Sequence, residues 1–180
     1  YVIQGDLYNL PFREEAFDFI LSLGVMQHTP DVKKSIMSIK PFLKKNGFIC
    51  LDFYSREGIY RFHPRYFIRF LTKRLSKEFL LKLLIILVPY FLFLKRFLRK
   101  IPILGKYLQH LILVADFKDI YPLSDEKLKQ FALLDTFDWL SPKYDNPQTR
   151  KTISLYMKEA KFKKIQVFKK GHLITRAMKT

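Results

Sequence analysis

The sequence predicts an α/β fold, in which a parallel sheet with an antiparallel strand at its edge is interrupted by a helical insertion. Apolar runs at 17–21 and 48–54 flank a stretch of helical periodicity. A strand, a helix and a strand joined by short connections imply a right-handed crossover between parallel strands. Two further strand-like runs, at 164–168 and 172–177, predict a hairpin. Between these parts, residues 55–122 are helical, basic and aromatic, without strand alternation.

The elements of the first part follow from local signals. Residues 1–4 should form a short strand. The first helix should begin at Thr29, whose hydroxyl suits the N-cap, because Pro30 then occupies the first helical position. Pro41 should kink this helix, since an interior proline costs roughly 3 kcal/mol. Asn46-Gly47 should close it before the next strand.

The later part of the chain predicts a loop at 139–147 and a helix at 149–161. We therefore expect three segments. Residues 1–55 should form the central part of the core, 56–135 a helical insertion that caps it, and 136–180 a loop, the final helix and the edge strands.

The composition of the chain limits which functions are possible. A length of 180 residues suits one domain, and a hydrophobic content of 49% excludes a disordered chain. The net charge of +17 is concentrated between Ser55 and His110, where 13 basic residues face two acidic ones. Such a basic field suits anionic lipid, nucleic acid or an acidic substrate. The single Cys50 cannot form an internal disulfide, which favours an intracellular protein, and the four scattered histidines predict no metal site.

Six short motifs occur in order near the amino end: Gly5-Asp6, Leu10-Pro11-Phe12, Phe17-Asp18, Leu21-Ser22-Leu23-Gly24-Val25, His28-Thr29-Pro30-Asp31 and Leu43-Lys44-Lys45-Asn46-Gly47. Together they resemble the central portion of a class I S-adenosylmethionine-dependent methyltransferase, of the type 11 group that includes ubiquinone and menaquinone methyltransferases. The resemblance covers residues 1 to about 55 and, more loosely, 148–180. It implies a Rossmann-like methyltransferase sheet, S-adenosylmethionine as cofactor, and methylation of an acceptor.

The resemblance also assigns cofactor-binding residues. It implies that Asp6, after Gly5, accepts a hydrogen bond from the adenine amino group, and that Leu7 offers its backbone amide to the same ring. Ser22 and Leu23 would lie under the methionine part of the cofactor. The alternative for Asp6 is a turn residue paired with Gly5.

The sequence departs from the family pattern in two important places. It contains neither the glycine-rich loop that follows the family's first strand nor the acid that follows its second strand. Both would lie before Tyr1, so we expect an N-terminally truncated domain. We also expect the chain alone to bind S-adenosylmethionine weakly or not at all.

Candidates for chemistry lie near the presumed methyl group. An oxygen nucleophile can require a base to remove its proton, and His28, on the loop after a strand end, is the first candidate. Its alternative is an exposed or helix-capping residue. Tyr54, His63 and Asp52 are weaker candidates, and Tyr54 and His63 are also expected to contact the acceptor.

A second candidate for the acceptor pocket is the segment 137–144, which contains the only tryptophan. A similar Asp-Trp-Leu-Ser-Pro segment recurs near the substrate pocket in methyltransferases with an enlarged insertion. The resemblance therefore suggests Asp138, Trp139 and Tyr144 as acceptor-binding residues. The alternative is an aromatic plug that anchors the insertion to the sheet.

The insertion contains an apolar run, Leu83–Leu94, which is too short to span a bilayer. Basic residues flank it on both sides: Lys73, Arg74, Lys77, Lys82, Lys95, Arg96, Arg99 and Lys100. Such a segment is typical of an interfacial membrane element or, alternatively, of a core with a solvated basic face. A further basic stripe would exist if residues 61–73 were helical, with members Arg61, Arg65, Arg69 and Lys73. Nucleic-acid binding is less favoured, because the aromatic residues suit a core better than stacking platforms.

Two functions remain open from the sequence. The first is S-adenosylmethionine-dependent methyl transfer to a small or lipid-like acceptor by a cytoplasmic enzyme, peripheral at an anionic membrane. The second is a non-catalytic, basic membrane-surface binding protein on a degenerate methyltransferase scaffold. The sequence leaves the acceptor and the oligomeric state open.

Overall fold

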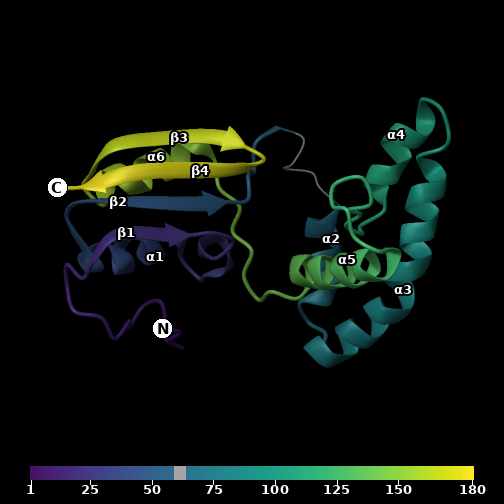
Figure 1. Ribbon diagram of the computed structural model, residues 1–180, viewed down its shortest axis with the longest axis horizontal. Coiled ribbons are helices and arrows are strands. Elements are labelled where there is room, and N and C mark those ends of the chain that lie inside the picture. Colours follow the sequence, from purple (N-terminus) through teal and green to yellow (C-terminus); the bar gives the residue numbers. More distant parts are fainter. Residues whose placement is uncertain (59–63) are drawn as a thin grey trace. The chain divides into compact units, whose positions relative to one another are not determined.

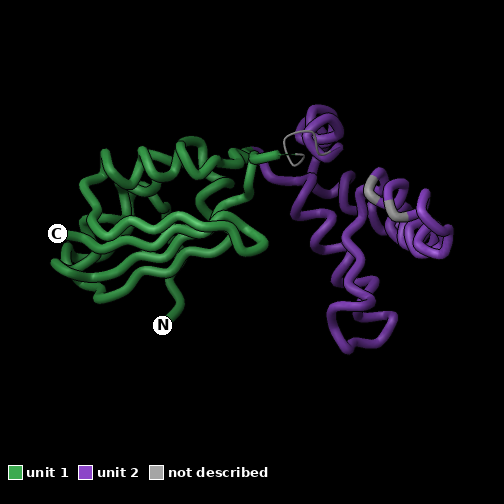
Figure 2. The backbone as a smooth tube through the Cα atoms, turned by 90° about the horizontal axis from the view of Figure 1, so that it is seen from above, with its two compact units in different colours: residues 1–61, 144–180 green, residues 62–143 purple. Residues whose placement is uncertain are grey.

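The computed structural model describes residues 1–58 and 64–180, apart from the side chains of Lys106 and His110. It divides into two compact units, which Figure 2 shows in green and purple. Unit 1 comprises Tyr1–Arg61 and Tyr144–Thr180, and unit 2 comprises Phe62–Lys143. His63 and Arg61, named above, lie outside the described residues.

Unit 1 is built on a sheet of four strands in the order β1-β2-β4-β3 (Figure 1). The strands are β1 (Phe17–Ser22), β2 (Leu43–Phe53), β3 (Phe162–Lys170) and β4 (His172–Lys179). β1 and β2 are parallel, whereas β4 is antiparallel to both of its neighbours. The predicted α/β class with a parallel pair is confirmed, but the predicted antiparallel strand at the edge of the sheet is wrong, because the antiparallel strand β4 lies inside the sheet and β3 forms its edge.

Two helices cover one face of this sheet. They are α1 (Val32–Ile39) and α6 (Arg150–Glu159), and Lys33 of α1 forms a 2.8 Å salt bridge with Glu159 of α6. Their apolar side chains pack on those of the strands, with Ile36, Leu43, Leu51, Phe53, Ile153, Met157 and Leu173 at the centre of the core. The short 3-10 helices η1 (Met26–His28) and η2 (Lys40–Phe42) flank α1.

Several local predictions in unit 1 are wrong. Residues 1–4 form no strand, because no neighbouring strand among the described residues pairs with them. The N-cap of α1 is Asp31, whose carboxylate accepts from the amide of Lys34 at 2.9 Å. The Thr29 hydroxyl, predicted as the N-cap, donates to the carbonyl of Met26 instead. Pro41 lies in η2, after α1 has ended, and Asn46-Gly47 lies within β2.

Unit 2 is helical. It contains α2 (Arg65–Thr72), α3 (Lys77–Leu98), α4 (Leu104–Leu108), the 3-10 helix η4 (Gln109–Leu111) and α5 (Asp125–Leu140). α3 packs along α5 around a second core, which contains Leu80, Leu84, Val88, Leu92, Val114, Ala132 and Leu140. The predicted loop at 139–147 begins two residues too early, since Trp139 and Leu140 complete the last turn of α5.

The carboxyl end of α5 is held by α2. The Arg69 guanidinium donates to the carbonyls of Trp139 at 2.9 Å and Pro142 at 2.8 Å, and the Thr72 hydroxyl donates to the carbonyl of Leu140 at 3.0 Å. These bonds satisfy carbonyls that a helix end otherwise leaves without an intrahelical partner. Arg69 is buried, so the predicted basic stripe on this helix is wrong at that position.

A buried carboxylate fixes the carboxyl end of α3. Asp116, whose side chain is 1% exposed, forms salt bridges with Arg96 at 3.2 Å and Arg99 at 3.1 Å. Burial alone would raise the pKa of this carboxyl, but the hydrogen bond to Arg96 and the charges of both guanidinium groups outweigh it. The pKa of Asp116 is therefore held below its ordinary value. The three residues join α3 to the segment that leads into α5.

Asp116→Asn should destabilise unit 2 by about 2 kcal/mol, since two buried charge-assisted bonds are lost. Because the native pKa is depressed, the stability that Asp116 supplies is present above the ordinary carboxyl pKa of about 4 and is lost as the pH falls below it. Urea unfolding from pH 7 to pH 3 should show a smaller loss of stability in the variant than in the parent. Asp119→Asn is the control, because its side chain is 80% exposed and pairs with the same Arg99. An equal effect of both substitutions would contradict the assignment.

Candidate functional site

The candidate site of unit 1 lies where three strands end or begin. β1 and β2 are parallel, so their carboxyl ends lie at the same edge of the sheet. β4 begins at this edge as well, because it runs antiparallel to β2 and pairs Leu173 with Phe53. Open α/β sheets bind ligands outside the carboxyl ends of their parallel strands. Polar side chains at this edge are therefore the first place to look for chemistry.

Asp52 is the central polar residue of this edge. Its carboxylate is buried, with 8% of the residue exposed, and one oxygen accepts from the amide of Gly24 at 2.5 Å. The other oxygen lies 2.9 Å from Nδ1 of His172. Gly24 adopts a φ of 68°, which favours glycine over residues with a side chain. Asp52 therefore joins the loop after β1 to the start of β4.

The ring of His172 is oriented by Asp52. An ionised carboxylate only accepts hydrogen bonds, so Nδ1 of His172 carries the proton and Nε2 of the neutral ring is an acceptor. The His172 side chain is 53% exposed. The sequence reasoning missed this residue, because it was interpreted only as the beginning of an edge strand. Asp52, an acid near the carboxyl end of an apolar strand, could have indicated that a polar partner such as His172 lies beside it.

Tyr54 lies between two histidine rings. Its ring packs edge-to-face against His28 and against His172, with centroids 5.5 Å apart in each case. Nδ1 of His28 lies 3.1 Å from the carbonyl of Tyr144 and donates to it, since a carbonyl can only accept. The structure thus brings together three residues predicted for the site: His28, Tyr54 and Tyr144. Nε2 of His28 is buried, in contrast to the exposed ring of His172.

Three buried polar groups near this edge have no hydrogen-bond partner among the described residues. They are Oγ of Ser22, Nε2 of His28 and both side-chain amide atoms of Gln27, a residue with no exposed surface. An unsatisfied buried polar group costs about 1–3 kcal/mol. The backbone around Gln27 is well held, since its carbonyl accepts from the amide of Asn146 at 2.8 Å. Unpartnered polar groups in a native protein are candidates for a functional role.

The predicted adenine-binding residues form a turn. One oxygen of Asp6 accepts from the amide of Tyr8 at 3.0 Å, which is the local pattern of an Asx turn. Asp6 is exposed, as is Gly5, while Leu7 packs partly against the core of unit 1. The Tyr8 hydroxyl accepts from Ser35 at 3.0 Å and so fixes the turn to α1. Asp6 thus acts as a turn residue, the alternative to adenine binding, and its side chain is exposed.

The remaining predicted site residues are divided between the two units. Ser22 is the last residue of β1, and Leu23, directly after it, is exposed. Asp138 is exposed on α5, and Trp139 packs against the core of unit 2, whereas Tyr144 belongs to unit 1. The acceptor-binding role of Asp138 and Trp139 stays a prediction.

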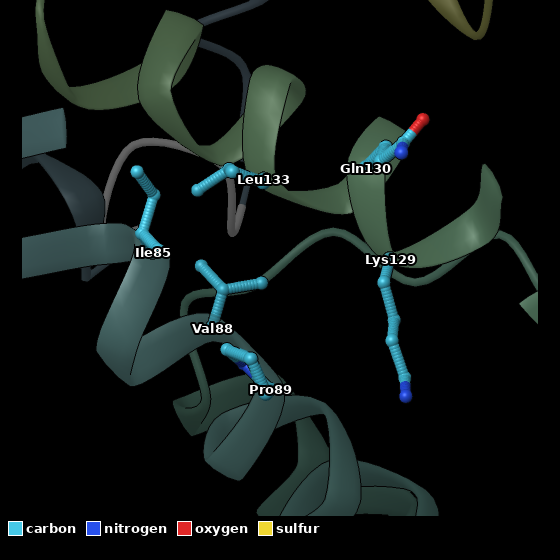
Figure 3. Close-up of a pocket in the computed structure, with 6 residues that line it drawn as sticks. All are labelled: Ile85, Val88, Pro89, Lys129, Gln130 and Leu133. Atoms are coloured by element: carbon cyan, nitrogen blue, oxygen red, sulfur yellow. The ribbon is translucent and has the colours of Figure 1, made fainter. Parts of the chain in front are cut away.

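Two hollows lie away from this edge. A cleft of about 120 Å³ lies between α3 and α5, where Ile85, Val88 and Leu133 face one another (Figure 3). It is smaller than typical ligand pockets of roughly 300–1,000 Å³. A second hollow of about 640 Å³ is lined by residues such as Tyr1, Phe12 and Phe17, the first residue of β1. It therefore lies at the amino end of that strand, opposite the candidate site.

We expect the neutral His172 ring to carry its proton on Nδ1, and Asp52→Asn to reverse this tautomer. In the variant, the side-chain oxygen must still accept from Gly24, so the amide nitrogen faces His172 and requires an acceptor there. Long-range ¹H–¹⁵N spectra at about pH 9, where imidazole is neutral, check this. The His28 tautomer is the internal control, because its partner is the carbonyl of Tyr144. An unchanged His172 tautomer would argue against the pairing.

Replacing the unpartnered Gln27 should stabilise the ligand-free protein. Gln27→Leu should raise the free energy of unfolding by about 1 kcal/mol, since it removes a buried amide without partners and keeps the volume. Gln148→Leu is the matched control. That residue is also buried, but its side-chain amide donates to the carbonyl of Asn146 at 2.8 Å, so its loss should destabilise. Chemical denaturation measures both; a destabilised Gln27→Leu would show that its amide is satisfied in solution.

Comparison with known proteins identifies the first part of the chain. Residues 1–51 match the family model of a methyltransferase domain. No curated protein matches the chain. One similar solved structure is a methyltransferase from Thermotoga maritima, described as S-adenosylmethionine-dependent and a possible histamine N-methyltransferase. It shares 15% identity at a TM-score of 0.48, over 100% of this chain and 64% of that one.

Two further structures are similar at low identity. A possible exported protein from Bordetella parapertussis shares 15% identity at a TM-score of 0.47, over 97% of this chain and 42% of that one. Human N-acetylserotonin methyltransferase, in complex with S-adenosylmethionine, shares 13% at a TM-score of 0.44, over 98% and 33%. The chain thus spans less than two thirds of each of these proteins. The segment 1–51, which contains β1, α1 and most of β2, thus matches the model of a methyltransferase domain.

Proposed function

We propose that the protein transfers a methyl group from S-adenosylmethionine to an acceptor bound at the carboxyl ends of β1 and β2. The observation that carries this proposal is the pairing of Asp52 with His172 at those strand ends, next to a segment of the methyltransferase family. S-adenosylmethionine, when bound, supplies an activated methyl group and its own leaving group. The protein's residues then have to position the acceptor and remove its proton.

The residues on the cofactor side have groups available for binding. The second carboxylate oxygen of Asp6 would accept from the adenine amino group, and the amide of Leu7 would face the same ring. The buried hydroxyl of Ser22, which has no partner among the described residues, would bind the polar end of the methionine moiety together with the backbone of Leu23. A bond to the charged Asp6 would contribute about 1.5–3 kcal/mol.

The acceptor side is formed by the histidines and Tyr54. Nε2 of His172 would take the proton of the acceptor, and Asp52 would hold the ring in the required tautomer and stabilise its cationic form. A positioned base contributes roughly 10²–10⁴-fold to a rate. His28, the first candidate from the sequence, has Nδ1 bound to a carbonyl and Nε2 buried, so it suits the wall of the acceptor site. The acceptor itself would be small or lipid-like.

A titration followed by NMR tests the proposal and detects weak binding. None of the six glycines lies within two residues of another, so the chain offers no glycine-rich loop and its affinity should be low. Addition of S-adenosylmethionine to the 180-residue chain should shift the amide signals of residues 5–7 and 22–24. Asp6→Asn should weaken the binding about tenfold, which corresponds to the loss of one bond to a charged group.

Asp18→Asn is the matched control, because its carboxylate is exposed and pairs with Lys44. Its binding should equal that of the parent chain. If no signal at residues 5–7 or 22–24 moves at saturating concentrations, the cofactor proposal is wrong. The alternative of a non-catalytic membrane-binding protein predicts that outcome.

A further inference from the structure

Helix α3 carries two apolar faces, of which one is buried within unit 2 and the other is exposed among the described residues. Leu80, Leu84, Val88 and Leu92 are buried against α5 at intervals of four. A second set lies on the opposite side of the helix at spacings of seven, four, three and four: Phe79, Ile86, Tyr90, Phe93 and Phe97. Each member of this set, called here the outer stripe, is more than half exposed. A contiguous apolar surface of this kind marks an interaction site.

The cations near the outer stripe divide into two groups. At the carboxyl end of α3, Arg96 and Arg99 bind Asp116, and Lys95 donates to the carbonyl of Val114 at 2.6 Å, while Lys100, two residues beyond the helix, is exposed without an acidic partner among the described residues. At the amino end, four exposed cations have no acidic partner among the described residues: Lys73, Arg74, Lys77 and Lys82. Lys82 follows Phe79 by three positions and precedes Ile86 by four, so it lies within the stripe.

The acids of unit 2 lie elsewhere along the sequence. Residues 64–100 contain ten Lys or Arg and one acid, Glu78, whereas the other six acids of the unit lie between 116 and 138. The Arg74 guanidinium also lies over the ring of Phe70, 4.1 Å from its centroid, so an exposed aromatic ring and a cation are joined next to the amino end of α3. The surface is therefore both apolar and positively charged.

We propose that unit 2 binds the surface of an anionic bilayer through the outer stripe of α3. The apolar side chains enter the interface, and Lys73, Arg74, Lys77 and Lys82 lie beside the lipid phosphates. The orientation is parallel to the bilayer, because one face of α3 is occupied by α5, and among the described residues no helix is long and apolar enough to cross a membrane. This inference does not depend on methyl transfer.

Charge complementarity favours lipid over the other occupants of such a surface. Two copies of this chain would bring two cationic surfaces together, which is unfavourable. Single-stranded nucleic acid needs a cationic groove with interleaved aromatic rings, whereas the outer stripe is one apolar face whose unpaired cations gather mainly at its amino end. An anionic bilayer satisfies the apolar stripe and the cations at the same time.

Flotation with vesicles tests the proposal on the full 180-residue chain. Vesicles of phosphatidylcholine and phosphatidylserine in equal parts should carry the protein upward in a gradient, and vesicles of phosphatidylcholine alone should carry much less. Lys77→Gln with Lys82→Gln should weaken binding to the anionic vesicles about 25-fold, or about fivefold for each cation. Tyr90→Gln with Phe93→Gln should weaken it at least tenfold.

Matched substitutions on α5 separate this surface from a general effect. Lys127→Gln with Lys129→Gln removes the same charge, and Phe131→Gln with Leu134→Gln removes two other exposed apolar side chains. Both control proteins should bind as the parent does. Absence of binding to anionic vesicles, or equal losses in the control proteins, would overturn the proposal.

A site-specific probe keeps the test independent of variant stability. In a Cys50→Ser background, Phe93→Cys and Leu134→Cys each provide one thiol for an environment-sensitive dye. The dye at position 93 should shift to the blue when anionic vesicles are added, while the dye at position 134 should not. Binding that is lost in the charge variant but produces no shift at position 93 would contradict insertion of the stripe.

Discussion

The candidate site depends on one buried carboxylate. Asp52 is the last residue but one of β2, and burial of an ionised group is costly unless hydrogen bonds compensate for it. Gly24 supplies one bond and His172 the other. Because these partners come from the loop after β1 and from the start of β4, the carboxylate sets the positions of three strand ends. An amide in place of this carboxylate would still accept from Gly24 but would leave Nδ1–H of His172 without an acceptor.

The same edge of the sheet contains polar groups that packing does not explain. Asp52 is compensated, but Ser22, Gln27 and the inner nitrogen of His28 are buried without partners among the described residues. A fold selected for stability alone would place apolar atoms at these positions. Their cost falls on one edge of the sheet, the one where parallel α/β sheets bind ligands. The distribution of unsatisfied groups and the topology therefore indicate the same location.

Local patterns in the sequence predicted the local parts of the structure. The run at 17–21 became β1, and the hairpin after residue 161 became β3 and β4, since apolar alternation and a tight turn are properties of neighbouring residues. The pairing of Asp52 with His172 joins residues 120 positions apart and depends on β4 lying between β2 and β3. No local pattern contains that strand order. Arg69 was misassigned for a similar reason, because its partners are carbonyls at the far end of α5.

In unit 2 the apolar run of α3 is easy to recognise in the sequence, but the exposure of one of its faces does not follow from that run. A helix that is apolar on all sides is expected to be buried on all sides. α5 covers only one side of α3, and the salt bridges of Asp116 with Arg96 and Arg99 hold the carboxyl end of α3 to the segment that leads into α5. The cations at the other end stay at the surface beside the outer stripe. An apolar face that ends in unpaired positive charge is complementary to an interface that is apolar inside and negative at its boundary, which is the physical description of an anionic bilayer.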